Sequence, residues 1–309
     1  MAASLKGVSP AVLLFSACSF WGIATVLNKA LLATISPSQL LFVQLLASAV
    51  VLWPACLIFG KAMPTGSGLW VAIGLGVLNP GISYTFSLMG LERISASVSS
   101  LLWATEPFLI LVLASVILKE QITFRVLGVI ALGFGGVVLV SNLFSRSPDE
   151  ASDVVGITYL FVAVLLCAIY TVYSRKVGDD VDALALVTVQ QTAGLGWATL
   201  LAVFATPGPA FSVLATVPLG ELAGAVVSGL LYYAAAYWLY LSALSRVSAA
   251  LAGGSFNIIS IVTIAVAFVF LGERLTAIQV LGAVLIILSA IALYWLTQAD
   301  QTAGRAKRE

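Results

Sequence analysis

The chain has 309 residues and a net charge of +1; 61% of its residues are hydrophobic and only 9% are charged. Soluble domains carry about a quarter charged residues, so this composition, with a mean hydropathy of +1.12, predicts a polytopic membrane protein. The near-zero net charge excludes the basic surface needed to bind nucleic acid, and the absence of histidine removes the commonest metal ligand.

The first apolar run follows Lys6 and extends from Ala11 to Leu32. A secretory signal peptide would begin similarly, but its apolar region is shorter than this run, which is long enough to span a membrane. We therefore expect an uncleaved first helix. The three cysteines lie singly within apolar runs, so we expect buried thiols, no disulfide framework, and neither a metal site nor a cofactor; they are Cys18, Cys56 and Cys167.

Further apolar runs of about 20 residues follow the first one, separated by short polar breaks. Most breaks are too short for an inserted soluble domain, so consecutive spans should pack antiparallel. The last stretch, residues 298–309, is polar, and we expect a disordered cytoplasmic tail there. The sequence thus predicts an all-α membrane protein with ten transmembrane helices, at about residues 10–33, 38–60, 69–90, 95–118, 123–143, 154–174, 182–205, 218–243, 248–271 and 276–297.

The distribution of basic residues predicts the orientation of these spans. If both termini are cytoplasmic, ten of the 14 Lys and Arg residues lie on the inner side. Membrane proteins concentrate Lys and Arg in their cytoplasmic loops. We therefore expect a multi-pass protein of the plasma (inner) membrane with both termini inside. The four basic residues left on the outer side are Lys29, Arg93, Arg146 and Arg274.

The second half of the chain repeats the first. LERISASVSS, from Leu91, resembles LSRVSAALAG, from Leu244, at an offset of 153 residues. WGIATVLNK, from Trp21, resembles CAIYTVYSR, from Cys167, at an offset of 146. Because each half holds five spans, an odd number, the second half must be inserted upside down, and inverted repeats let a carrier alternate between two mirror-related states. The expected five-helix units are residues 1–145 and residues 154–297.

Each half also contains a similar corner, LKEQITFRVLG from Leu118 and LGERLTAIQVLG from Leu271, and the fourth span contains TEPF. With ten spans in two repeats, these motifs make residues 10–297 resemble the drug/metabolite transporter superfamily, in its EamA-type branch. Aromatic side chains along spans one, three, four and eight are similar to those of the bacterial aromatic amino-acid exporters of that branch. The resemblance implies a central cavity surrounded by spans one, three, four, six, eight and nine, with spans five and ten behind it.

The resemblance and the repeat predict a secondary transporter, independent of ATP, for small amphipathic metabolites. Amino acids, aromatic ones included, are the expected substrates, and export by alternating access around a central cavity is the expected mode. Drugs or lipophilic cations, and nucleotide-type metabolites, are alternatives on the same scaffold, and a membrane channel is an alternative of another class. Phosphate-bearing substrates would need several buried basic residues, and only Lys29 lies partly inside a span.

An enzyme is not expected, because the sequence offers neither a nucleophile–base pair nor a metal cluster. The expected partners are a small-molecule substrate and the lipid bilayer, without nucleic acid, and a monomer would suffice.

The fourth span carries a carboxylate, Glu106, directly before Pro107. A charge at that depth is costly, so the side chain should face a wet cavity or a partner. Proline removes a backbone donor and predicts a kink or hinge near Trp103. Glu106 could bind a substrate ammonium or take up a proton, or it could be a structural acid that holds the kink. The second half has Ile259 and Ser260 at this place, so any role of Glu106 is asymmetric.

Ser99, Trp103 and Glu106 should share one helix face. An aromatic wall beside a carboxylate suits an amine with an apolar side chain, through apolar contact and cation–π attraction. The alternative is a tryptophan that packs between helices. In the third span, the Asn79-Pro80 step exposes backbone polar groups, which is tolerated where they line a cavity or form a hinge.

The remaining candidate binding residues are spread over four spans. Tyr84 lies one turn beyond Pro80, and Tyr233 and Tyr237 form an i, i+4 stripe in the eighth span. Asn257 could hold a substrate carboxylate or bridge helices. The resemblance places Trp21, the family's tryptophan in the first span, near the cavity.

Three charged residues lie near span ends. Lys29 should extend its ammonium group to the membrane interface. Glu120 and Glu273, at the matching corners, should each cap the N-terminus of the span that follows.

Overall fold

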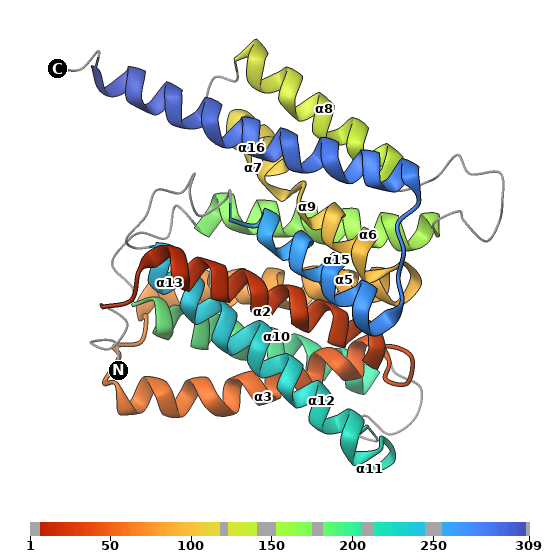
Figure 1. Ribbon diagram of the computed structural model, residues 1–309. Coiled ribbons are helices and arrows are strands. Elements are labelled where there is room, and N and C mark those ends of the chain that lie inside the picture. The colour runs from red at the N-terminus through yellow and green to blue at the C-terminus, as the bar shows by residue number, and fades with distance from the viewer. Residues whose placement is uncertain are drawn as a thin grey trace.

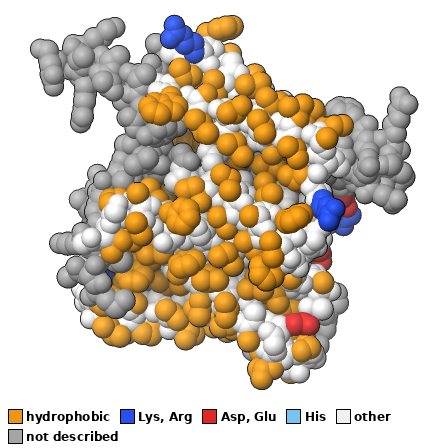
Figure 2. Space-filling model, viewed as in Figure 1, with side chains coloured by type: hydrophobic (Ala, Val, Ile, Leu, Met, Phe, Trp, Pro, Cys, Tyr) orange, Lys and Arg blue, Asp and Glu red, His pale blue; other side chains and the backbone are white. Residues whose placement is uncertain are grey.

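The computed structural model describes residues 7–117, 123–140, 153–174, 182–204, 213–244 and 255–306. Every regular element within these ranges is a helix (Figure 1). Seven of the described helical runs are long and apolar enough to cross a membrane, and three shorter helices are also apolar. The face seen in Figure 2 is covered by apolar side chains, and its few charged side chains lie toward the edges of the view. The chain is therefore an all-helical, multi-pass membrane protein.

The first half of the chain begins with two long helices that each start at a proline. Pro10 and Pro37 occupy the first helical turn, where the fixed φ and the missing N–H of proline are tolerated. The helices of this half are α2 (Pro10–Leu31), α3 (Pro37–Ile58), α4 (Gly66–Gly76), the π-helix η1 (Val77–Ile82), α5 (Ser83–Arg93), α6 (Ala96–Trp103), α7 (Glu106–Ile117) and α8 (Phe124–Val140).

The second half ends in a helix that is longer than expected. α16 continues to Ala306, so most of residues 298–309, which we predicted to be disordered, is helical, and that prediction was wrong. The stretch contains Ala and Gln and no proline, which favours the continuation of a helix once it has begun. The helices of this half are α9 (Val154–Ser174), α10 (Ala183–Phe204), α11 (Val213–Thr216), α12 (Leu219–Gly229), the π-helix η2 (Leu230–Ala236), α13 (Tyr237–Leu244), α15 (Asn257–Leu271) and α16 (Ala277–Ala306).

The fourth span is interrupted near its middle. α6 ends at Trp103 and α7 begins at Glu106, with a turn between them. The carbonyl of Leu102, at the end of α6, accepts from both the hydroxyl of Thr105 at 2.6 Å and its N–H at 3.1 Å. Pro107 therefore lies in the first turn of α7, where it needs no N–H partner.

The helical runs Gly66–Arg93 and Leu219–Leu244 each contain a π-helical turn. Val77, the first residue of η1, and Leu230, the first residue of η2, are separated by the repeat offset of 153. In η1 the backbone of Asn79, next to Pro80, leaves helical geometry (φ −146°, ψ 115°). η2 forms without a proline. Such turns interrupt the regular hydrogen-bond ladder and are frequent at functional sites.

The corner after α15 corrects an expectation about Glu273. Its carboxylate does not cap the following span but reaches α6 of the first half, where it accepts from the N–H groups of Ala96 at 2.8 Å and Ser97 at 2.9 Å. Gly272 makes this possible, because it adopts a left-handed conformation (φ 67°) and ends α15 by reversing the chain.

The following helix, α16, is capped by its own residues. The Thr276 N–H donates to Gln279 Oε1 at 2.9 Å, and the Gln279 N–H donates to Thr276 Oγ1 at 3.3 Å. This reciprocal capping box leaves no need for Glu273 at that position. Glu120, for which we expected the same role in the first half, lies outside the described residues.

The helices pack as two bundles and two pairs. α5, α6 and α7 pack on α9 and are termed the α9 bundle; α12, η2, α13 and α15 pack on α2 and are termed the α2 bundle. α3 packs on α10, and α8 packs on α16; the latter pair lies side by side at the upper edge of Figure 1. The α9 bundle thus combines two spans of the first half with one of the second, and the α2 bundle does the reverse.

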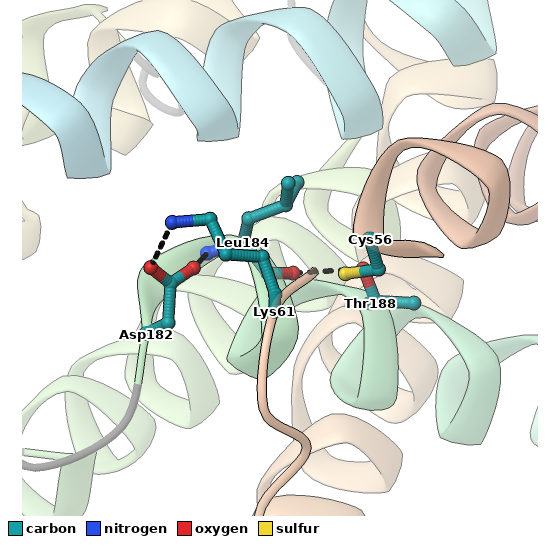
Figure 3. A network of polar contacts seen from close by, with 5 residues as sticks. All are labelled: Cys56, Lys61, Asp182, Leu184 and Thr188. Carbon is teal, nitrogen blue, oxygen red and sulfur yellow. Dashed lines mark hydrogen bonds and ion pairs between the residues drawn. The ribbon is translucent and has the colours of Figure 1, made fainter. Parts of the chain in front are cut away.

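Ion pairs mark two opposite ends of the helices. At one end, where α5 finishes and α9 begins, Arg93 Nε donates to Asp153 Oδ2 at 2.8 Å. At the other end, where α3 finishes and α10 begins, Lys61 Nζ points at Asp182 Oδ2 and lies 2.6 Å from it (Figure 3). These are termed the Arg93 end and the Lys61 end.

We expect Asp153→Asn to lower thermal stability slightly at neutral pH but not at acidic pH. The Arg93 guanidinium, together with the N–H of Gly156, holds the pKa of Asp153 below its usual value. Such a carboxyl contributes stability above its unfolded-state pKa and loses that contribution as the pH falls through its folded-state pKa. Asparagine can keep the 3.0 Å cap on the Gly156 N–H and removes only the charge. Melting temperatures of the two proteins should converge when measured from about pH 7 down to about pH 3; a constant difference would exclude the ion pair as its cause.

Candidate functional site

An aromatic cluster occupies the contact between the α2 bundle and the α9 bundle. The Tyr84 ring of α5 stacks on Trp103 of α6, with centroids 5.6 Å apart and planes at 19°. The same ring meets the edges of Tyr232 and Tyr233, both in η2, at 5.3 and 5.4 Å. Tyr233 is fully buried. The cluster therefore forms where the third, fourth and eighth spans meet.

Two phenol groups face each other at the centre of this contact. The hydroxyls of Tyr84 and Tyr237 lie 3.2 Å apart, and the Asn79 side-chain amide donates to Tyr237 Oη at 3.5 Å. Tyr84 and Tyr237 are 153 residues apart, which is the offset at which the sequences of the two halves resemble each other. The side-chain oxygen of Asn79, Oδ1, is buried and has no hydrogen-bond partner among the described residues. This oxygen is therefore an acceptor available for a ligand.

Trp21 of α2 closes the cluster from the other side. Its ring meets Tyr237 edge-on at 5.3 Å, and its Nε1–H donates to the carbonyl of Tyr232 at 3.1 Å. The ring of Phe256, directly before α15, meets the same indole edge-on, with ring centroids 5.9 Å apart. A buried tryptophan usually finds a partner for its N–H, and here that partner is a backbone carbonyl of η2.

Glu106 lies beside this cluster but faces α9. Its side chain is buried, with 7% of its surface exposed, and Thr171 Oγ1 donates to its Oε1 at 3.3 Å. Cys167 is also buried on this face of α9, one turn before Thr171. The break before α7 removes the continuous helix face that we expected Ser99, Trp103 and Glu106 to share, because a turn separates Glu106 from the other two.

Ser99 and Asn257 are buried on the two helices that meet behind the cluster. Ser99 lies one turn before Trp103 on α6, and Asn257 is the first residue of α15. The two helices are joined by the Ser260 hydroxyl, which donates to the carbonyl of Ser100 at 2.8 Å. Ser260 stands where the first half has Pro107, so the second half uses this position for a contact between helices.

Four residues of the site were not among the predicted ones: Tyr232, Cys167, Thr171 and Phe256. The internal repeat could have found two of them. Cys167 stands 146 residues after Trp21, so it holds the place of Trp21 in the second half, and Thr171 lies one turn further along α9. Tyr232 belongs to the aromatic run from which only its neighbours were chosen.

The site combines a buried carboxylate with aromatic faces, phenol hydroxyls and an amide. The centroids of neighbouring rings lie 4.9 to 6.4 Å apart, so the rings of the cluster pack against one another in this conformation. In the part of the chain that the structure describes, the contacts of Lys29, Lys61 and Arg93 lie at helix ends and not at the cluster. This chemistry suits a ligand with a positive charge and an apolar body.

A separate groove of about 580 Å³ opens between α4 and α9. Val71, Ile169 and Tyr173 are among its mainly apolar lining residues. It lies on the outer surface of the helices and does not include the aromatic cluster.

A multi-pass helical protein with polar groups buried between two helix bundles has the architecture of a membrane transporter. The chain belongs to the EamA-like transporter family, whose model matches residues 8–142 and again residues 154–295. This is a family of transporters.

Individual relatives agree with this assignment. The chain is 26% identical to an uncharacterized transporter of Clostridium kluyveri over 84% of this chain and 83% of the relative. It is 27% identical to the uncharacterized transporter YcxC of Bacillus subtilis over 70% of each chain. A solved crystal structure covers 94% of this chain, and 97% of its own, with a TM-score of 0.66 at 18% identity, which shows a shared fold.

Proposed function

We propose that this chain is a secondary transporter of small amphipathic metabolites, that amino acids with aromatic or apolar side chains are its substrates, and that it exports them across the plasma membrane. The observation that carries the proposal is the buried Glu106 carboxylate beside the aromatic cluster. Intramembrane carboxylates that face a bundle interior mark substrate or ion pathways.

The recognition of an amine follows from these groups. A protonated amine would pair with Glu106, and its apolar side chain would lie against the faces of Trp103 and Tyr84. Cation–π attraction adds about 0.5–2 kcal/mol, depending on how far the site is desolvated. The amides of Asn79 and Asn257 are the groups proposed to hold a substrate carboxylate.

Alternating access is supported by the directions of equivalent helices. In the proposed repeat, α9 corresponds to α2 and α10 corresponds to α3. α9 begins at the Arg93 end, where α2 finishes. α10 begins at the Lys61 end, where α3 finishes. The two segments matched by the family model support the same division. We therefore propose ten spans in two inverted units, residues 1–145 and 154–297, with both termini cytoplasmic and a monomer as the working unit.

A lipophilic cation is the second candidate substrate. A carrier of zwitterions usually needs a positive group for the carboxylate, and the contacts of Lys29, Lys61 and Arg93 are made away from the cluster. An amine without a carboxylate would not need Asn79 and Asn257 to bind a carboxylate, and it would still pair with Glu106.

Counterflow into proteoliposomes tests both candidates. We expect vesicles preloaded with unlabelled tryptophan or phenylalanine to accumulate the labelled compound, and saturation of the rate with concentration. Tryptamine and phenethylamine, which lack the carboxylate, serve as matched probes; preference for them would favour the lipophilic-cation alternative. Flux that neither saturates nor shows counterflow would contradict a carrier and favour a channel. The same assay at two pH values separates proton coupling from facilitated diffusion.

A further inference from the structure

The Arg93 end of the molecule carries two polar contacts that the transport site does not use. The first comes from α2: Lys29 Nζ donates to the carbonyls of Leu91 and Glu92, both at 3.0 Å, where α5 finishes. These are C-terminal carbonyls without a helical partner, and a cation is favourable at that helix end. Lys29 therefore binds the end of α5 instead of only extending toward the membrane interface.

The second contact comes from the end of α15. The Glu273 carboxylate accepts from the N–H groups of Ala96 and Ser97, and also from Ser97 Oγ at 2.7 Å. It thus takes up backbone donors at the start of α6, where a negative charge is favourable.

Both contacts join the α2 bundle to the α9 bundle at one place. The two charged side chains belong to α2 and to the end of α15, and their partners belong to the junction between α5 and α6 (residues 91–97). The cation meets the carboxyl end of α5 and the anion meets the amino end of α6, so each charge fits the helix end that it touches. This set of contacts is termed the α5–α6 clamp.

The position of the clamp relates it to the site. α5 and α6 also carry Tyr84 and Trp103, which form the α9-bundle side of the aromatic cluster. A separation of the two bundles at the Arg93 end would have to break the clamp before it could expose these rings from that end.

We propose that the α5–α6 clamp is a gate, which holds the Arg93 end closed in this conformation and opens when the transporter exposes its site to that side. The inference rests on the proposed alternation between two states but not on the identity of the substrate. The contacts are hydrogen bonds at partly exposed helix ends, which can be broken and re-formed in each cycle. The sequence has charges of the same sign at the repeat-equivalent positions, Arg175 and Glu120, which lie outside the described residues.

Thiol labelling of the substrate-free protein tests the gate. Cys167 is the reporter, because it is buried on α9 one turn before Thr171, which donates to Glu106; Cys18→Ser and Cys56→Ser leave it as the single cysteine. A membrane-impermeant thiol reagent is applied separately to each face of membrane vesicles. We expect Lys29→Gln with Glu273→Gln to raise the labelling rate from the Arg93 end about tenfold, because loss of both charge–dipole contacts shifts the population toward the open state.

The controls separate a gate from general loosening. Arg274→Gln changes the residue next to Glu273. The Arg274 guanidinium lies 6.0 Å from the centroid of the Phe268 ring and takes no part in the clamp, so this variant should leave the labelling rate unchanged. Ser97→Ala removes a single hydroxyl contact, should give a smaller increase, and provides the test if the double variant does not fold.

Equal rates in the double variant, the Ser97→Ala variant and the parent protein would overturn the proposal. A rise of the same size from both faces would overturn it as well. Because the measurement needs no substrate, it does not depend on the outcome of the counterflow experiment.

Discussion

Replacing Glu106 with glutamine should lower counterflow of an amine substrate by roughly 10- to 100-fold. Glutamine has the same shape and keeps an oxygen that can accept from Thr171, so the turn before α7 should persist. What is lost is the negative charge, and hydrogen bonds to charged groups contribute about 1.5–3 kcal/mol, with a tenfold change for every 1.4 kcal/mol. The apparent affinity and the maximal rate of counterflow, measured at two pH values, check this expectation.

Glu92→Gln is the matched control for this experiment, because Glu92 is an exposed carboxylate on α5 and contributes only its backbone carbonyl to the α5–α6 clamp. Its removal should leave counterflow close to that of the parent protein. If Glu106 also takes up a proton during transport, the counterflow rate of the parent protein should depend on pH, and that of the glutamine variant should not. Normal transport by Glu106→Gln across the pH range would leave this residue only a structural role in the kink.

Gly76→Ala and Gly229→Ala should each destabilise the folded protein by about 1–3 kcal/mol, the usual cost of overpacking. A Cβ atom at Gly76 would lie 2.4 Å from the carbonyl oxygen of Gln190 and 2.6 Å from its Cα. A Cβ atom at Gly229 would lie 2.5 Å from the Cα of Gln44 and 2.6 Å from its oxygen. Both obstacles are backbone atoms in a neighbouring helix, so relief requires the helices to move apart.

Two nearby glycines provide the controls. Gly74 precedes Gly76 by two residues, and Gly196 lies on α10, the helix that Gly76 approaches; a Cβ atom at either one meets no atom within 4 Å. Alanine at these positions should leave stability unchanged or raise it by up to about 1 kcal/mol, because glycine is the poorer helix former. Thermal unfolding in detergent compares the four variants. Equal losses in all four would contradict the close helix contact as the cause.

The sequence predicts the helices well where apolar length is the only signal required. The spans expected at about 154–174 and 182–205 are α9 (Val154–Ser174) and α10 (Ala183–Phe204) in the structure. The thickness of the bilayer sets this length, so a count of apolar residues is sufficient to place them. The break at Pro107 and the irregular turn at Pro80 are likewise visible in the sequence, because proline cannot continue the hydrogen-bond ladder.

The partners of buried side chains could not be obtained in this way. η2 has no proline, so its π-turn is indicated only by its equivalence to η1. The sequence places Tyr84 and Tyr237 in different spans, and their contact follows from how two halves meet in space. Glu273 was assigned to the wrong helix for the same reason: a carboxylate after a left-handed glycine can reach any helix end nearby, and only the tertiary arrangement selects α6.

The last helix, α16, is longer than the apolar core of a membrane. Its 30 residues extend about 45 Å at 1.5 Å per residue, whereas a bilayer core is about 30 Å thick. Its last apolar run ends at Leu296, and residues 297–306 are mainly polar, so the final turns extend beyond the apolar length of the helix. A fluorescent domain joined to Ala306 without a flexible linker would therefore be held at a fixed distance and angle, and its polarised emission would report the tilt of this helix.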